Sequence, residues 1–266
     1  MLQQAADFRD ESVALHDLLE PLDDAGLART TQFKQWRIDD ILAHLHLFNE
    51  TAMLSLQDPD AFAASAADMQ RRRQAGASLR EATTAVLNGL GGRALRAAWR
   101  AGYERTAACF AEADPKARVP WYGPEMSVLS SITARLMETW SHAQAIYDLL
   151  GVERVDTDRV RNIAVLGVNT FGWTFANRGE PVPEQRPHLR LTAPSGAVWT
   201  WHDPSDAECI EGLASEFCQV VAQTRNIADT GLRVRGPVAK RWMAQAQCFA
   251  GPPQDPPAPG SRYRAK

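Results

Sequence analysis

The chain has 266 residues, of which 45% are hydrophobic and 23% charged, and its 29 basic and 32 acidic residues give a net charge of −3. This composition is typical of a globular protein with a well-buried core, and the absence of a basic excess gives no support for nucleic-acid binding. No segment has the pattern of a signal peptide or the length of a membrane span, so the sequence predicts a cytoplasmic protein without membrane association.

The first 180 residues are predicted to be almost entirely helical. Apolar residues recur at helical spacing from Ala5 to Leu19, and Pro21 ends this first helix. A second helix starts near Asp39, where a negative charge suits a helix N-terminus. Ser78-Leu-Arg-Glu81 has the form of a capping box, which predicts the start of a further helix. Glycines at 89, 91 and 92 interrupt the pattern before helix 93–113.

Proline, glycine and aromatic residues then form a predicted loop over 115–124, which could close one end of a helix bundle. A long amphipathic helix follows from Ser127 to Leu150, with Gly151 as its C-terminal stop. Another helix is expected over 158–176. Trp121 and Tyr122 in the loop, and Trp140 in the long helix, could line a pocket, although such aromatic residues are more often core or loop anchors.

A proline-rich segment at 177–187 marks the predicted domain boundary. Beyond it, alternating residues predict a hairpin of strands 188–192 and 197–201, then a helix over 210–223, a strand over 232–235 and a helix over 237–249. The expected organisation is therefore a helical bundle over 1–180, a small α+β domain over 181–251 and a disordered proline-rich tail over 252–266.

Several chemistries have no motif in this chain. The four cysteines are widely scattered and form no C-x-x-C pair, so we expect buried free thiols rather than a disulfide framework or a zinc knuckle. No P-loop, G-x-S-x-G or dinucleotide fingerprint is present, and nucleotide, α/β-hydrolase and Rossmann chemistry therefore lack support.

Three potential metal ligands stand on the two amphipathic helices. Glu138 and His142 are four residues apart, which places them on one face of a helix, and His44 lies on the inward face of the second helix. Two imidazoles and one carboxylate form the ligand set of catalytic zinc and of some other divalent ions. The competing interpretation is a hydrogen-bonded core histidine beside a Glu-His pair on a solvated face. His46 points to a different helix face and is the weaker ligand candidate.

Two nearby residues have open roles. Trp36 is expected to pack at the start of the second helix. Asp39 is expected to be a structural helix-start charge. Alternatively, Asp39 or Asp40 supports a ligating histidine through a hydrogen bond.

These motifs resemble a known family. Trp36-x-x-Asp-Asp-Ile-Leu-Ala-His44-Leu, then Glu138-x-x-x-His142 and a mixed C-terminal domain, resemble the mycothiol-dependent maleylpyruvate isomerase family within the DinB-like metal-binding bundles. The Asn177-Arg-Gly-x-Pro-Val-Pro segment, the Leu-Thr-Ala-Pro-Ser-Gly hairpin and the Cys248-Phe-Ala-Gly-Pro-Pro end also resemble a subgroup described only as metal-binding proteins of uncertain activity.

The resemblance implies a mainly α protein with a DinB-like four-helix bundle. It also implies a divalent metal, with zinc favoured, that is held by His44, Glu138 and His142. The implied chemistry uses a low-molecular-weight thiol such as mycothiol. In the isomerase the thiol adds to a substrate double bond while the metal acts as a Lewis acid and lowers the thiol pKa. The resemblance further implies an arginine of the C-terminal domain that contacts a small acidic substrate. Arg225 is the expected match, with Arg178 and Arg235 as rivals.

Three functions stay open from the sequence. The first is a metal-dependent isomerase or transferase that uses a thiol. The second is a metal-dependent hydrolase on the same bundle, in which the metal activates water. The third is a non-catalytic ligand-binding or regulatory protein. The sequence does not determine the oligomeric state.

Overall fold

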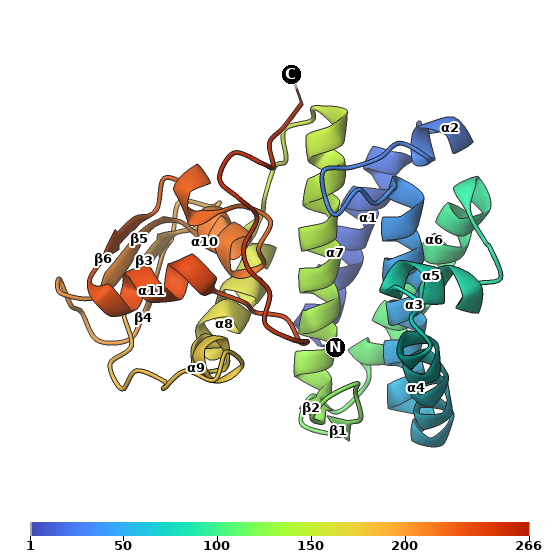
Figure 1. Ribbon diagram of the computed structural model, residues 1–266, viewed down its shortest axis with the longest axis horizontal. Helices are drawn as coiled ribbons and strands as arrows, with labels where there is room; N and C mark the ends of the chain where they lie inside the picture. The colour runs from blue at the N-terminus through green and yellow to red at the C-terminus, as the bar shows by residue number, and fades with distance from the viewer. Residues whose placement is uncertain (1, 266) are drawn as a thin grey trace. The chain divides into compact units, whose positions relative to one another are not determined.

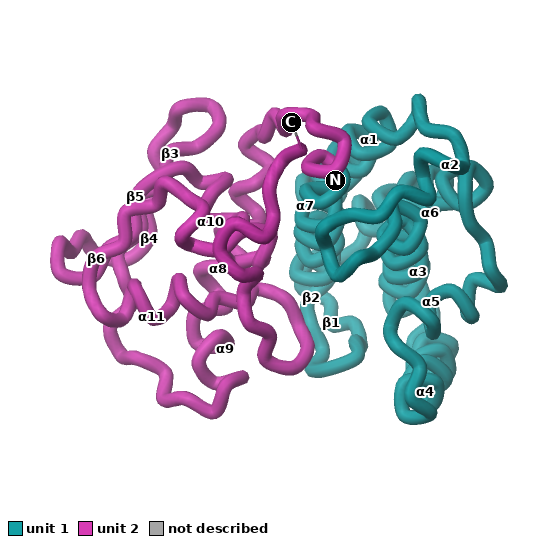
Figure 2. The backbone as a smooth tube through the Cα atoms, turned by 45° about the horizontal axis from the view of Figure 1, so that its top comes forward, with its two compact units in different colours: residues 1–146 teal, residues 147–266 magenta. Residues whose placement is uncertain are grey.

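The computed structural model describes residues 2–265, which form two compact units that divide the chain between residues 146 and 147 (Figure 2). Within the described residues, no helix combines the length and the apolar character that crossing a bilayer requires. The first unit is helical apart from one short hairpin, and the second combines helices with a small sheet. The predicted mainly α fold with a smaller α+β part is confirmed.

The first unit is built around α1, α3, α6 and α7, which run side by side (Figure 1). The last turn of α7 is grouped with the second unit. The helices of this unit are α1 (Gln3–Leu19), α2 (Asp24–Leu27), α3 (Ile38–Gln57), α4 (Pro59–Gln74), α5 (Leu79–Val86), α6 (Gly92–Ala111) and α7 (Val128–Leu150). The short hairpin pairs β1 (Arg118–Val119) with β2 (Met126–Ser127) in antiparallel register.

Local sequence signals set the ends of these helices as predicted. The Ser78 side chain accepts a hydrogen bond from the Glu81 N–H, and the Glu81 carboxylate accepts one from the Ser78 N–H, which completes the capping box of α5. Gly151 adopts a φ of 71° directly after α7, a conformation that favours glycine and ends the helix. The two predicted helices that carry the candidate ligands are also confirmed, with His44 on α3 and with Glu138 and His142 on α7.

The core of the first unit lies where α6 packs against both α1 and α3. Gly102 permits the close approach of α3 and α6, because a Cβ there would lie 2.8 Å from Glu50 Oε1 and 3.1 Å from His46 Nδ1. The largest fully buried side chains of this unit include Phe8, Leu15, Leu19, Leu27, Trp99, Tyr103, Phe110 and Trp140. Trp140 is thus a core residue, not part of a pocket lining.

The second unit contains a four-stranded sheet with the strand order β4-β3-β5-β6. β3 pairs with β4 in an antiparallel hairpin and with β5 in parallel, and β5 pairs with β6 in antiparallel register. The elements are η1 (Asp158–Val160), α8 (Arg161–Asn169), α9 (Phe171–Ala176), β3 (His188–Thr192), β4 (Val198–Trp201), β5 (Cys209–Leu213), α10 (Ala214–Val221), η2 (Ile227–Asp229), β6 (Arg233–Arg235) and α11 (Pro237–Gln245).

One predicted element of this unit is wrong in part. The helix expected over 210–223 is strand β5 for its first residues and becomes helix only from Ala214. Cys209 and Ile210 are buried where β5 pairs with β3, so sheet pairing decides the conformation of a short apolar segment that helical spacing also fits. The hairpin and the strand near 233 are confirmed. The final helix is confirmed over Pro237–Gln245, and the helix expected over 158–176 is divided into η1, α8 and α9.

The boundary between the compact units lies at residues 146 and 147 and not near residue 180. Helix α8 packs against α10, and Gly167 lies so close to α10 that a Cβ would be 2.8 Å from Val221. The ring of Phe171 contacts the ring of Trp242 with centroids 5.0 Å apart. These buried contacts place α8 and α9 in the second unit, and the proline-rich segment 177–187 therefore lies inside that unit.

The tail expected to be disordered is ordered against the second unit. The Asn226 side chain donates to the Pro257 carbonyl at 2.8 Å, the Asp229 carboxylate accepts from the Gly260 N–H at 2.8 Å, and the Ala265 N–H donates to the Asp148 carbonyl at 2.8 Å. Proline-rich composition predicts little apolar burial, but hydrogen bonds from a preformed surface hold the segment instead.

Candidate metal centre

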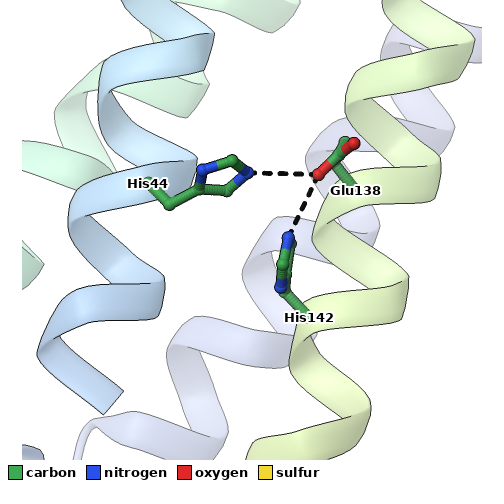
Figure 3. A group of neighbouring side chains, drawn as sticks. All are labelled: His44, Glu138 and His142. Atoms are coloured by element: carbon green, nitrogen blue, oxygen red, sulfur yellow. Dashed lines mark hydrogen bonds and ion pairs between the residues drawn. The ribbon is translucent and has the colours of Figure 1, made fainter. Parts of the chain in front are cut away.

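Helices α3 and α7 bring His44, Glu138 and His142 together in the first unit, with the three side chains pointing toward one another (Figure 3). Glu138 Oε2 lies 3.2 Å from His44 Nε2 and 3.1 Å from His142 Nε2. The two histidines contact each other edge to face, with ring centroids 4.7 Å apart. One carboxylate oxygen is thus shared by two imidazoles from two helices.

The electrostatics of this group follow from its burial. The side chains of His44 and His142 are 10% and 11% exposed, and that of Glu138 is 21% exposed. Burial lowers the pKa of His44 to about 4, despite the hydrogen bond with Glu138, so its imidazole is neutral near pH 7. Burial by itself would raise the pKa of Glu138, but the hydrogen bonds and charge interactions with His142 and His44 together outweigh it and hold the pKa well below the usual value. An ionised carboxylate therefore faces a neutral imidazole of His44.

The donor set fits a divalent cation. The two imidazole nitrogens and the carboxylate oxygen all lie within 4.8 Å of one another, and among residues 2–265 this is the one such group of three histidine, cysteine or acidic side chains. A neutral imidazole and an ionised carboxylate are the protonation states that a metal requires. Three protein ligands leave coordination positions for water or substrate, as in catalytic rather than structural zinc sites.

Aromatic rings surround the histidines. The Trp36 ring lies parallel to His142 at 6.2 Å and edge-on to His44 at 5.7 Å, and the Phe33 ring contacts His142 at 4.9 Å. Phe48, one turn after His44 on α3, contacts His44 at 4.7 Å. Trp36 therefore contributes to the wall of the site as well as preceding α3, and Phe33 was not expected from the sequence.

A tight loop delivers Phe33 and Trp36. The Thr31 N–H donates to the Trp36 carbonyl at 2.8 Å and the Trp36 N–H donates to the Phe33 carbonyl at 2.8 Å. Lys34 and Gln35 adopt positive φ values of 49° and 57°, a turn conformation that glycine or asparagine usually supplies. The sequence gives no turn signal here, which is why the pattern did not reveal the loop.

The contacts of His46, Asp39 and Asp40 show how each of these residues is placed relative to the three-residue group. His46 lies outside the three-residue group, with Nδ1 4.0 Å from Glu50 Oε1. Asp39 Oδ1 accepts from the Gly92 N–H at 3.1 Å, and Asp40 Oδ2 accepts from the Arg37 N–H at 2.9 Å. Both carboxylates thus support the start of α3, and the structural interpretation of Asp39 agrees with the structure. The alternative, a carboxylate hydrogen-bonded to a ligating histidine, does not.

The arginine predicted to meet substrate has a partner inside its own unit. Both terminal nitrogens of Arg225 donate to the Asp148 carboxylate, at 2.8 Å and 2.6 Å, and the two side chains are 12% and 3% exposed. Of its rivals, Arg178 pairs with Asp255 at 2.9 Å, and Arg235 is exposed on β6. A bidentate buried pair gives Arg225 a structural role, and its contact with substrate stays a prediction.

A different arginine was missed. Arg135 is buried on α7 at 5% exposure, three residues before Glu138. The spacing of Arg135, Glu138 and His142 is i, i+3 and i+7, which places all three on one helix face. This spacing can be read from the sequence, and it is the signal that could have identified Arg135 as a neighbour of the candidate metal ligands.

The comparisons with known proteins agree with this architecture. Residues 8–147 match the family described as the mycothiol maleylpyruvate isomerase N-terminal domain. Two curated relatives are uncharacterized proteins of Mycobacterium tuberculosis, from strains CDC 1551 / Oshkosh and ATCC 25618 / H37Rv. Each is 33% identical over 252 residues, which cover 93% of this chain and 95% of the relative.

Among solved structures, the fold is similar to crystal structures of the mycothiol-dependent maleylpyruvate isomerase and of a point mutant of it. Both have a TM-score of 0.51 and cover 83% of this chain and 88% of the other, at 16% and 15% sequence identity respectively. The matched domain covers more than half of the chain, and it contains α3, the three-residue group and most of α7. The chain therefore belongs to the mycothiol maleylpyruvate isomerase family.

Proposed function

We propose that this protein is a metal-dependent enzyme that uses a low-molecular-weight thiol, such as mycothiol, to isomerise or modify a small acidic substrate. The observation that carries the proposal is the convergence of His44, Glu138 and His142. Nε2 of both histidines and one oxygen of Glu138 would hold the ion, and zinc is the ion that this ligand set favours. Membership of a family named for a mycothiol-dependent isomerase supports the thiol.

The protein's own groups prepare this site. Burial keeps His44 neutral, and Glu138 supplies the single negative charge that partly balances a divalent cation. The rings of Trp36, Phe33 and Phe48 restrict the orientation of the imidazoles and limit the access of water. When bound, a divalent ion with open positions supplies Lewis-acid chemistry and lowers the pKa of a coordinated thiol.

The first test is elemental analysis of protein purified without added metal or chelator. We expect about one equivalent of a divalent metal per chain, as one group of three ligands predicts. A chain that holds no metal, and takes up none when zinc is added, would contradict the proposal.

The second test is turnover of maleylpyruvate and related unsaturated acids with and without mycothiol. We expect reaction only when both metal and thiol are present. Hydrolytic turnover that needs metal but no thiol would identify a hydrolase on the same bundle. Metal binding without turnover of any kind would indicate a binding protein.

A further inference from the structure

Arg135 is a buried cation that lacks an anionic partner. Its side chain makes no hydrogen bond or ion pair to residues 2–265, and its Nη1 is fully enclosed without an acceptor. Buried guanidinium groups are almost always paired, because leaving water without a replacement partner is costly. The five N–H donors of Arg135 therefore have no acceptor among the described protein groups.

The position of Arg135 connects it to the three-residue group. Its guanidinium lies over the ring of Phe48 at 5.8 Å, and the same ring contacts His44 at 4.7 Å. Glu138 follows it by three residues on the same face of α7 and attracts it without forming an ion pair. Glu138 Oε2 lies 3.2 Å and 3.1 Å from Nε2 of the two histidines, so this carboxylate is directed toward the three-residue group and not toward Arg135.

An aromatic cluster encloses the guanidinium. Arg135 lies over Trp121 at 5.3 Å, and Trp121 stacks on Phe62 at 6.0 Å. Tyr122 contacts both Phe48 and Phe62 at 5.7 Å and is 41% exposed, so the cluster reaches the protein surface. The loop between β1 and β2 that carries Trp121 and Tyr122 thus forms an apolar surround for one charged group. A low-polarity surround strengthens the attraction between a guanidinium and an anion.

The charges at the site favour a bound anion. Glu138 gives one negative charge, Arg135 one positive charge, and a bound divalent ion would leave the site with an excess of positive charge. We infer that Arg135 is the substrate-binding residue that fixes a carboxylate of the acidic substrate through a planar, two-pronged contact. This inference rests on the proposed function for the identity of the substrate, but the affinity of Arg135 for a carboxylate can be tested separately.

The alternative is a structural cation that only packs against Phe48 and Trp121. Cation–π contacts can stabilise a buried arginine, but they occupy the faces of the guanidinium and leave its N–H groups without acceptors. A structural cation would bind no added carboxylate. A substrate-binding arginine would.

The experiment measures binding of succinate and of its uncharged analogue succinamide by isothermal titration calorimetry, using the full chain at constant ionic strength. Wild-type protein is expected to bind succinate at least about ten-fold more tightly than succinamide, as one charge-assisted bidentate contact predicts. Arg135→Met is expected to lose this preference, and Arg135→Lys to retain only part of it because lysine lacks the planar fork. The control is Arg105→Met, which removes an exposed arginine paired with Glu50 and should keep the preference.

Metal content is measured for every sample, and circular dichroism checks that each variant is folded. A chain that holds no metal and takes up no added zinc would contradict the proposed function, whereas the succinate comparison would still decide the role of Arg135. Wild-type protein without a preference for succinate would overturn the inference. So would an Arg135→Met or Arg135→Gln variant that is folded and keeps the full preference.

Discussion

The two compact units each bury an arginine, and they treat its charge in opposite ways. In the second unit, Arg225 donates two hydrogen bonds to Asp148, so its charge is neutralised within the fold. In the first unit, Arg135 lies between aromatic rings with no acceptor for its N–H groups among the described residues. The Asp148 carboxylate offsets the cost of burying the charge of Arg225, whereas no carboxylate among the described residues pairs with Arg135 to offset that cost. The difference indicates which arginine is free to bind a ligand.

The same comparison revises the expectation from family resemblance. That expectation placed an acid-binding arginine in the C-terminal domain, at Arg225. A guanidinium already held by a bidentate carboxylate would have to exchange partners before it could bind a substrate. Arg135 needs no such exchange, and it shares a helix face with two of the proposed metal ligands.

Replacing Arg225 by methionine should have the largest effect on stability. The change would leave the Asp148 carboxylate, 3% exposed, without its bidentate partner, and breaking a buried pair costs about 3–5 kcal/mol. Urea denaturation of wild-type and variant protein measures the loss. The double variant Arg225→Met/Asp148→Leu should recover part of it, because the carboxylate is removed together with its bidentate partner, although Arg262, which Asp148 also attracts, then loses that attraction. An Arg225→Met variant of normal stability that fails to bind succinate would return the substrate role to Arg225.

Replacing His44 by alanine should reduce metal affinity by about 100-fold or more, since even partners that only support a ligand contribute about 10- to 100-fold. Competition with a coloured zinc chelator measures the change. His46→Ala is the matched control, because it removes a buried histidine of the same helix that lies outside the three-residue group. Added zinc should raise the melting temperature of wild-type and His46→Ala protein but not that of His44→Ala. Equal zinc affinity in both variants would exclude His44 as a ligand.

Replacing Asp39 by alanine should cost about 1–2 kcal/mol of folding stability, because its carboxylate accepts a hydrogen bond from the Gly92 N–H and ties the start of α3 to the start of α6. Metal affinity should stay at the wild-type value, since Asp39 contacts none of the three proposed ligands. Thermal denaturation together with zinc titration measures both quantities. A loss of metal affinity of about ten-fold at unchanged stability would instead support an indirect role in metal binding.

Replacing Arg135 by methionine should have the smallest effect on stability, within about 1 kcal/mol of wild type and in the stabilising direction if it differs. Methionine keeps the apolar stem against Phe48 and Trp121 and removes an unpaired buried charge. The same urea denaturation used for Arg225→Met gives a direct comparison of the two arginines. A loss of several kcal/mol at position 135 would show that the aromatic cluster needs the cation for folding.

Much of the first unit could be predicted from the sequence because its signals are local. Helical spacing predicted α1, α3 and α7, the Ser78 capping box predicted the start of α5, and Gly151 predicted the end of α7. The i, i+4 spacing of Glu138 and His142 follows from helix geometry alone. The grouping of either residue with His44, 94 residues from Glu138 in the chain, was suggested by the apolar neighbours of His44 and strengthened by family resemblance.

Contacts between distant residues decided the rest. Residues 210–213 form a strand and not a helix because the edge of β3 is there to pair with them. The tail is ordered because hydrogen-bond donors and acceptors of the second unit hold it. The same holds for the two arginines, since a sequence shows a charge but not the carboxylate or aromatic ring that meets it. The sequence by itself determined the helices and the residue types of the candidate metal site. The tertiary structure decided which charges are neutralised, because burial and pairing arise only when separate helix and sheet faces meet.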